Sequence, residues 1–332
     1  MPYQLRIKWL RKFCRKITIC KIIVHKRRFF CMKKCYLLLF FIVFFLTFSC
    51  KKTETPAYLI LSPDDINVNI ANFNKEHDTD YDKDELEVIK QQVFTEVLVS
   101  LNGKELGYWQ LPCKIPLLPD YSKENNIRVT PCVRVPNVTL NSVPYNFLLS
   151  IERFLTIDKE GEYRFSNLQF EYAKNVTFPM LETFVQTTIF KPRDTVNNVV
   201  PMEIYYEGQK SMGRISLEDT VVFFNVVTPY IDLYKGERHY WEMYYKCENG
   251  EMTTYLDVRS SNTILPQQDM IVLPATNSWK KIYIDLSEMV TWVSGDAAKV
   301  TVRLGIRGLK KSDANAYFYF DNVKLMSMPA PY

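Results

Sequence analysis

The carboxylates that most resemble a metal site alternate along one polar stretch: Asp78, Asp80, Asp82 and Asp84. Such a pattern opens the calcium loop of an EF-hand, which also needs glycine at position six and a bidentate glutamate at position twelve. Lys83 and Ile89 occupy those positions here. We therefore interpret residues 72–87 as a solvated acidic loop and expect no cofactor. Structural calcium, in this loop or at Asp321 after a late strand, is the alternative.

The chain beyond residue 50 offers little that could perform catalysis. It has two histidines, His77 and His239, and it lacks a Gly-x-Ser-x-Gly motif, zinc-ligand spacing and a Cys–His pair. We therefore predict that the protein is not an enzyme. A glycan-active enzyme remains an alternative, since the two carboxylates that hydrolyse a glycosidic bond need only meet in space.

Aromatic side chains are the more promising binding groups, because the apolar faces of sugars stack on exposed rings. In the alternating stretch 240–246, one face carries Trp241, Met243 and Tyr245, and the other carries Tyr240, Glu242 and Tyr244. One face must be core, and the other is free to line the outer surface of a sheet. The candidate ligand-binding residues are Tyr240, Trp241, Tyr244 and Trp292, whereas Trp279 is expected in the core.

Two of the cysteines are placed to form a disulfide bond. The polar stretch 120–126 predicts a hairpin turn, and a register that pairs residues 118 and 127 sets Cys113 directly opposite Cys132. Opposite residues on adjacent strands are close enough for a disulfide. Two buried free thiols are the alternative, and Cys247 is expected to be a buried free thiol.

A further cysteine, Cys50, follows a short apolar run over residues 36–49. Its 14 residues are too few for a spanning helix, which needs about 20, and fit a signal peptide after the basic Lys33 and Lys34. The small Ser49 before the cysteine favours cleavage at that point. We predict a lipoprotein signal, with lipid on Cys50 and a tether over residues 50–56. An uncleaved anchoring helix is the alternative.

The start Ser49-Cys50-Lys51-Lys52 resembles lipoproteins of Bacteroidetes-type bacteria. The resemblance implies an extracytoplasmic outer-membrane lipoprotein. Lys51 and Lys52 replace the acidic run that often directs these proteins to the cell surface, which favours the periplasmic face. Translation from Met32 would make residues 32–49 the signal and residues 1–31 an upstream extension.

The charge of the chain is distributed very unevenly. Residues 1–50 carry 12 of the 42 basic residues and none of the 37 acidic ones, so the chain after the signal has a net charge of −7. Nucleic-acid binding would require a basic surface to neutralise phosphates. We therefore exclude nucleic acid as a partner and expect a membrane contact through lipid only.

The segment after the tether predicts an all-β domain over residues 57–175. Strand patterns cover 58–61, 66–70 and 93–101, and Asn102-Gly103 is a strong hairpin turn before residues 105–111. The stretch 96–112 resembles the PEGA domain and related small β-sandwiches of envelope lipoproteins. That resemblance implies an interaction or spacer module and supplies no catalytic residues.

A crossing region over residues 176–200 precedes a second all-β domain over 201–327, with a start near residue 180 as the alternative. Three strand patterns follow in order. The first contains Trp279 (278–286), the second alternates (299–306), and the third ends in Asp-Asn-Val-Lys-Leu (316–325). This order resembles a galactose-binding-like jelly roll, a fold that carbohydrate-binding modules often use. Fold alone does not give a ligand.

We therefore predict two β-sandwich domains in a non-catalytic, lipid-anchored envelope protein that binds a protein or glycan partner. The overall pattern resembles a group of two-domain Bacteroidetes lipoproteins. A purely structural envelope component is a further alternative. Thr195 and Thr220 lie in Asp-Thr-Val motifs, which match the O-glycosylation pattern of these bacteria.

Overall fold

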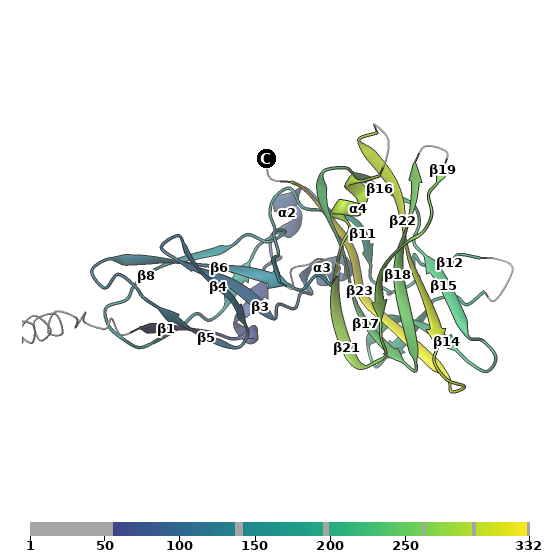
Figure 1. Cartoon of the computed structure of the whole chain (residues 1–332), viewed down its shortest axis with the longest axis horizontal. Coiled ribbons are helices and arrows are strands. Elements are labelled where there is room, and N and C mark those ends of the chain that lie inside the picture. Colours follow the sequence, from purple (N-terminus) through teal and green to yellow (C-terminus); the bar gives the residue numbers. More distant parts are fainter. Residues whose placement is uncertain (1–55, 137–141, 195–198, 261–262, 294–296, 331–332) are drawn as a thin grey trace, which may run out of the picture. The chain divides into compact units, whose positions relative to one another are not determined.

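The computed structural model describes residues 56–332, apart from 137–141, 195–198, 261–262, 294–296 and 331–332. These residues form one compact unit built mostly of β-strands (Figure 1). Two hydrophobic cores organise it, one in an N-terminal and one in a C-terminal sandwich. The prediction of an all-β protein with two sandwiches is confirmed. In the described part of the chain, no helix combines the length and apolarity needed to cross a membrane.

The N-terminal sandwich contains three sheets and two short helices. Sheet order is β5-β1-β9, β10-β2, and β4-β3-β6-β7 with β8 beside β6. The elements are β1 (Ala57–Leu61), β2 (Ile66–Val68), α2 (Phe73–His77), α3 (Lys83–Lys90), β3 (Glu96–Leu101), β4 (Lys104–Gln110), β5 (Cys113–Leu117), β6 (Glu124–Val133), β7 (Val143–Pro144), β8 (Ile151–Thr156), β9 (Glu162–Arg164) and β10 (Leu168–Phe170), with a 3₁₀ turn at Pro63–Asp65.

The predicted hairpin at Asn102-Gly103 joins β3 and β4, with both residues at positive φ. The predicted loop over 72–87 is wrong, because it folds into α2 and α3. Asp82 caps α3 by accepting hydrogen bonds from the backbone N–H groups of Asp84 and Glu85, and the Glu85 carboxylate accepts a hydrogen bond from the Asp82 N–H. This capping box satisfies backbone donors at the helix start.

The C-terminal sandwich packs two large sheets face to face. One has the order β13-β14-β23-β17-β21 with β11 beside β23, and the other has β12-β15-β22-β18-β19 with β16 and β20 attached. The elements are β11 (Thr177–Glu182), β12 (Lys191–Pro192), β13 (Glu203–Glu207), β14 (Lys210–Leu217), β15 (Phe223–Val227), β16 (Ile231–Tyr234), β17 (Glu237–Glu248), β18 (Gly250–Ser260), β19 (Thr263–Ile264), β20 (Gln268–Leu273), β21 (Thr276–Asp285), α4 (Ser287–Thr291), β22 (Lys299–Lys310) and β23 (Ala316–Pro329).

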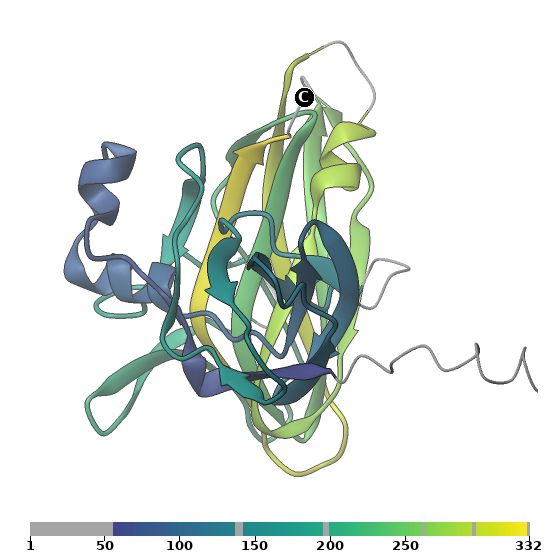
Figure 2. The same ribbon diagram turned by 90° about the vertical axis from the view of Figure 1, so that its left-hand side faces the viewer.

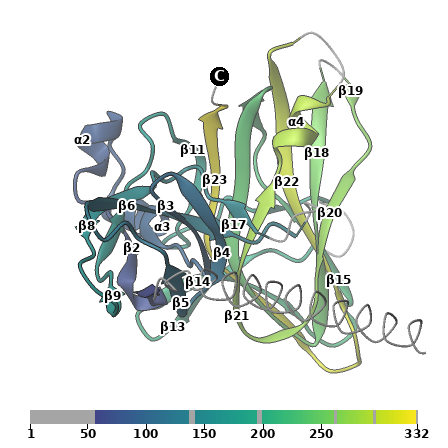
Figure 3. The same cartoon turned by 60° about the vertical axis from the view of Figure 1, so that its left-hand side comes forward.

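The last strand, β23, is central to its sheet (Figures 2 and 3). It pairs with β11, β14 and β17, so residues from the predicted crossing region take part in the second sandwich. Strands β17 and β18 follow one another in sequence but belong to different sheets, and the chain passes between the sheets at Asn249, which has φ of 54°.

The two sheets bury alternate residues against each other. Trp241 and Met243 of β17 and Phe318 of β23 face Leu256 and Leu304 of the opposite sheet, all fully buried. Because side chains alternate along a strand, the residues between them project away from this core. We call the face of β13-β14-β23-β17-β21 that points away from the core the outer face.

Candidate functional site

Part of the outer face is covered by the N-terminal sandwich. Tyr240, Tyr283, Met326 and Met328 project from it into the N-terminal hydrophobic core. The Tyr240 ring packs edge-on against Phe147, with centroids 5.1 Å apart. The two sandwiches therefore share a buried junction instead of meeting only through a linker.

Three ionisable side chains lie inside this junction. Glu242 and Lys324 are fully buried, and the Lys281 side chain is 4% exposed. The Glu242 carboxylate lies 3.3 Å from the Lys281 ammonium and 3.8 Å from the Lys324 ammonium. Burial lowers the pKa of Lys281, and it lowers that of Lys324 well below its ordinary value, because removing an ammonium from water disfavours its charged form.

Lys324 also holds the end of α3. Its ammonium donates hydrogen bonds to the backbone carbonyls of Val88, Ile89 and Gln91, at 2.8, 3.1 and 3.2 Å. The last carbonyls of a helix have no partner within it, and a cation there is favourable. Lys324 therefore joins the two sandwiches directly, and Lys281 contributes through its ion pair with Glu242.

The remainder of the outer face is open and carries a row of aromatic rings. Tyr205 of β13, Tyr319 of β23 and Trp279 of β21 are each partly exposed. The ring centroids of Tyr205 and Tyr319 are 5.9 Å apart, and those of Tyr319 and Trp279 are 6.4 Å apart. We call these three residues the aromatic row.

A cation lies over each ring of the aromatic row. Arg214 lies 4.3 Å from the centroid of Tyr205, Lys246 lies 5.2 Å from that of Tyr319, and Lys210 lies 5.9 Å from that of Trp279. Strand pairing explains the arrangement, because Tyr319 stands opposite Arg214 on one side and Lys246 on the other. Such contacts hold the charged groups beside the rings.

Two polar atoms of β14 at this surface lack a hydrogen-bond partner among the described residues: Nε of Arg214 and Oγ of Ser216. Both atoms are buried, and buried polar atoms are normally paired with protein or water. These two atoms lie beneath the surface, so the groups that a ligand could reach are the partly exposed rings and the cations over them. This combination makes the aromatic row our candidate binding site.

The residues predicted from sequence lie in four different settings. Trp241 is fully buried in the C-terminal core, so its prediction as a ligand-binding residue is wrong. Tyr240 is on the outer face but buried in the junction, which overturns that prediction too. Tyr244 is partly exposed, with Lys281 at 4.8 Å from its ring centroid. Trp292 is 80% exposed at the end of α4 and lies outside the aromatic row.

The sequence reasoning missed the aromatic row because it assigned Trp279 to the core. In β21 the core positions are Ile282 and Ile284, so Trp279, Lys281 and Tyr283 point the other way. The alternation Ile282–Ile284 was a usable signal for this. Tyr205 could not have been placed beside Tyr319, because the strand order follows from long-range pairing.

The predicted Cys113–Cys132 disulfide is wrong, and both residues are free thiols. Strand β5 pairs with β1 and places Cys113 opposite Leu61, whereas β6 pairs with β3 and places Cys132 opposite Glu96. The two cysteines therefore belong to different sheets. Burial raises the pKa of the Cys132 thiol to about 12 and that of Cys247 to about 11, and Cys247 is the predicted buried free thiol.

Two of the aspartates considered for calcium have other roles. Asp82 caps α3, and Asp321 is ion-paired with Lys210. Among the described residues, no cluster of three or more His, Cys, Asp or Glu side chains is arranged to hold a metal ion.

Two predicted modification sites, Cys50 and Thr195, lie outside the described residues. Thr220 is exposed in the turn between β14 and β15. Its accessibility is compatible with modification but does not test it.

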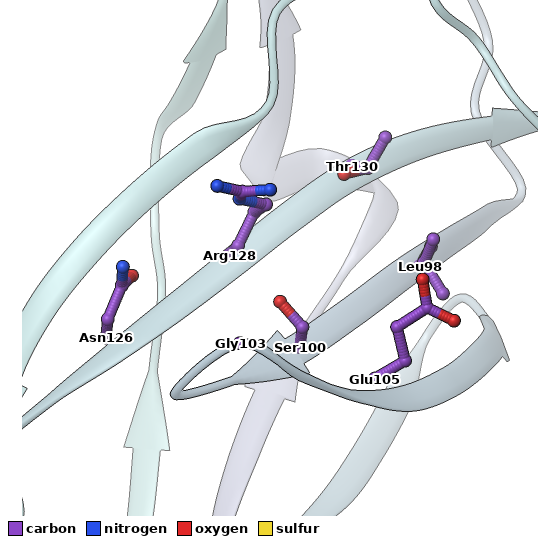
Figure 4. Close-up of a pocket in the computed structure, with 7 residues that line it drawn as sticks. All are labelled: Leu98, Ser100, Gly103, Glu105, Asn126, Arg128 and Thr130. Atoms are coloured by element: carbon purple, nitrogen blue, oxygen red, sulfur yellow. The ribbon is translucent and has the colours of Figure 1, made fainter.

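The N-terminal sandwich has a polar pocket of about 180 Å³ on the sheet of β3, β4 and β6 (Figure 4). It is lined by Leu98, Ser100, Gly103, Glu105, Asn126, Arg128 and Thr130. Arg128 is ion-paired with Glu152, and no aromatic ring lines the pocket. It therefore offers less to a ligand than the aromatic row.

Comparison with known proteins assigns no family. No family model matches the chain, and no curated protein matches it. The resemblances to PEGA domains and to Bacteroidetes lipoproteins therefore stay predictions.

Solved structures similar to part of the chain include a tailspike protein of bacteriophage CBA120, with 10% identity over 46% of this chain and a TM-score of 0.30. A cyclase from Fischerella matches 48% at 12% identity with a TM-score of 0.33, and a family 30 carbohydrate-binding module of Clostridium thermocellum matches 45% at 14% with 0.30. The matches span 19% of the tailspike chain, all of the cyclase and 96% of the module. Likenesses this distant assign no ligand.

Proposed function

We propose that this protein is a non-catalytic, lipid-anchored protein of the bacterial cell envelope and that its C-terminal sandwich binds a glycan through the aromatic row. The observation that carries the proposal is the succession of Tyr205, Tyr319 and Trp279 across the open part of the outer face. The planes of neighbouring rings are inclined by 60° and 63°, so each ring would contact a different part of a glycan. Aromatic side chains contribute large contact areas at low entropic cost.

The polar groups around the rings support a hydroxyl-rich ligand over an apolar one. Arg214 and Lys246 provide donors beside the rings, and Glu203 lies 3.9 Å from Arg214 as an acceptor. Sugar hydroxyl groups both donate and accept hydrogen bonds, so a mixed set of charged groups suits them. A partner protein with an apolar docking surface would leave these charges buried without partners.

Anchoring through Cys50 would hold this surface in the envelope, where glycans are abundant. The proposal has two separate tests. Intact-mass analysis of the protein from native membranes should find a chain that begins at a lipid-modified Cys50. An unlipidated chain that keeps the residues before Met32 would contradict the anchor.

The binding surface is tested by a glycan array with the purified chain from residue 51 and its Trp279→Ala variant. We expect wild-type signal on a set of neutral oligosaccharides, lost in the variant, with no product formed on prolonged incubation. Hydrolysis of a bound glycan would replace this proposal with an enzyme. Absence of glycan signal, together with a co-purifying envelope protein, would replace it with a protein-binding or structural role.

A further inference from the structure

The opposite side of the C-terminal sandwich carries a cluster of four arginines. Arg193 follows β12, Arg259 lies on β18, and Arg303 and Arg307 lie on β22. Their side chains project away from the core, since the residues that alternate with them on β22, including Val302, Leu304 and Ile306, are fully or almost fully buried in it. We call these four residues the arginine ladder.

Two tyrosine rings each contact two arginines of the ladder. Arg259 and Arg303 lie over the ring of Tyr230, with their guanidinium carbons 4.4 and 4.9 Å from its centroid. Arg193 and Arg307 lie over the ring of Tyr255, at 5.6 and 5.8 Å. Each ring is thus shared by two guanidinium groups, and these contacts hold both in place.

One buried carboxylate fixes the middle of the ladder. The Asp257 side chain is 1% exposed, and it accepts hydrogen bonds from Arg193 at 3.0 Å and from Arg303 at 2.7 Å. Asp257 stands directly opposite Arg303 in the pairing of β18 with β22. Because this carboxylate is buried beneath the arginines, it orients them without presenting its own charge to solvent.

A glycine in β22 allows the Tyr255 ring, and the arginines around it, to lie close to the sheet. Gly305 stands opposite Tyr255, and a Cβ at this position would lie 2.0 Å from Cζ of the tyrosine ring. The Tyr255 ring therefore lies flat across β22, where its hydroxyl bonds to Asn225. The tyrosine is fully buried, so the accessible groups above it are the guanidinium edges of Arg193 and Arg307.

The arginines keep donors that the protein does not use. A guanidinium has five N–H groups. Arg259 is exposed and has no ion pair among the described residues, and the side chains of Arg193, Arg303 and Arg307 are 25, 20 and 33% exposed. Arg307 is paired with the exposed Asp269. At the other end, Asp232 stands level with Arg259 across Thr301 and accepts a hydrogen bond from the Thr301 hydroxyl. Next to Arg307, Nε2 of Gln267 is buried and lacks an acceptor among the described residues.

The spacing of the ladder indicates an extended ligand. Arg303 and Arg307 are four residues apart on β22, which corresponds to about 13 Å along a strand. Arg259 stands opposite Thr301, so the ladder from Arg259 to Arg307 extends over about 20 Å. Guanidinium groups recognise carboxylate and sulfate oxygens through paired hydrogen bonds.

We propose that the arginine ladder is a second binding site, for a linear polysaccharide that carries carboxylate or sulfate groups. It lies on the sheet opposite the aromatic row and is independent of it. The chain after residue 50 has a net charge of −7, so any polyanion would be attracted only at the arginine ladder, which rules against a ligand that needs an extensive basic surface, such as a nucleic acid. A polyanion with more widely spaced charges is favoured.

The test measures binding of the chain from residue 51 to polygalacturonate, chondroitin sulfate, inorganic sulfate, neutral dextran and a single-stranded DNA oligonucleotide. We expect one of the two acidic polysaccharides to bind best, with affinity that falls as salt increases. Arg259→Gln and Arg307→Gln should each weaken it about tenfold, as expected for a charge-assisted hydrogen bond.

Arg128→Gln is the matched control, because this arginine lies on the N-terminal sandwich in a surface ion pair, and it should leave the affinity unchanged. Equal affinity in wild type and both ladder variants would overturn the proposal, as would DNA binding as strong as polysaccharide binding. Inorganic sulfate binding as tightly as the polymers would overturn the extended site. Trp279→Ala should leave polyanion binding intact, so a failure here and a failure of the aromatic row are distinguishable.

Discussion

The Lys324 ammonium, on the last strand of the chain, lies 2.8 Å from the backbone carbonyl oxygen of Val88 in α3. This contact links two sandwiches across 236 residues of sequence. The same ammonium faces the buried Glu242, which also pairs with Lys281. Covering one part of the outer face in this way fixes which part stays open, and the aromatic row occupies the open part.

Glu242→Gln should destabilise the fold strongly. The substitution keeps the shape of the side chain but leaves Lys281 and Lys324 without their shared counter-charge. Removing one partner from a buried ion pair costs about 3–5 kcal/mol. We expect a loss of about 3 kcal/mol in the free energy of unfolding, measured by urea denaturation.

The control is Glu87→Gln, because Glu87 and Lys90 form an ion pair in which both side chains are about half exposed. Exposed pairs contribute about 0–1 kcal/mol, so this variant should stay close to wild type. Equal free energies of unfolding for the two variants would show that the buried charges of the junction do not stabilise the fold.

The buried neutral ring of His239 should make the protein less stable in mild acid, where the ring would have to take up a proton. Its Nε2 donates to the Tyr234 carbonyl at 2.7 Å, so in the neutral ring Nδ1, 2.8 Å from the Ser327 hydroxyl, is the unprotonated nitrogen. Burial lowers the pKa of His239 below 6.5. The unfolded chain therefore binds a proton more readily than the folded one, and stability falls as the pH drops below 6.5.

Unfolding free energies between pH 7.5 and 5.5 measure this slope. His77 has a pKa lowered in the same direction but is partly exposed. His239→Gln should flatten the slope more than His77→Gln does. A wild-type stability that rises toward pH 5.5 would contradict the buried neutral ring.

All three cysteines should be free thiols, so adding a reducing agent should not change the stability of the protein. The chain from residue 51 contains Cys113, Cys132 and Cys247, all free. Thiol titration of the unfolded, unreduced protein should count three, and a reducing agent should leave the melting temperature unchanged. A count of one would indicate that Cys113 and Cys132 are bridged.

Gly305→Ala should disturb the face that carries the arginine ladder. The added methyl group would collide with the Tyr255 ring, and overpacking of this kind costs about 1–3 kcal/mol. The same substitution in a Tyr255→Ala background should cost clearly less, since the clash is gone. Equal costs in a double-mutant cycle of unfolding free energies would show that the ring does not lie on Gly305.

Local signals predicted the fold where neighbours in sequence are neighbours in space. Asn102-Gly103 specified a hairpin because both residues tolerate positive φ. Asp82 and Glu85 have the spacing of a capping box, which predicts the start of α3. The alternating aspartates around them were compared with a calcium loop instead. The cysteine prediction failed because it assumed that β5 and β6 pair, whereas β5 pairs with β1, some 50 residues earlier.

The candidate sites depended on information that the sequence does not hold locally. Whether Tyr240 or Tyr319 is exposed is decided by where the N-terminal sandwich covers the outer face. Tyr240 and Tyr244 were correctly assigned to the face opposite Trp241, yet Tyr240 is buried by Phe147 from another domain. Long-range strand pairing also brought Arg193 to Asp257, 64 residues away.

The most direct test of glycan binding by the aromatic row is the dissociation constant of one array-positive neutral oligosaccharide, measured by calorimetry for wild type, Trp279→Ala and Trp292→Ala. Trp292 is a matched control, because it is the most exposed large hydrophobic side chain in the described part and lies outside the row. Truncating an aromatic residue that dominates a binding site costs about 2 kcal/mol or more, so loss of the Trp279 ring should weaken binding about tenfold or more. We predict this loss for Trp279→Ala and wild-type affinity for Trp292→Ala; the reverse result, or equal affinity in all three proteins, would contradict the proposed site.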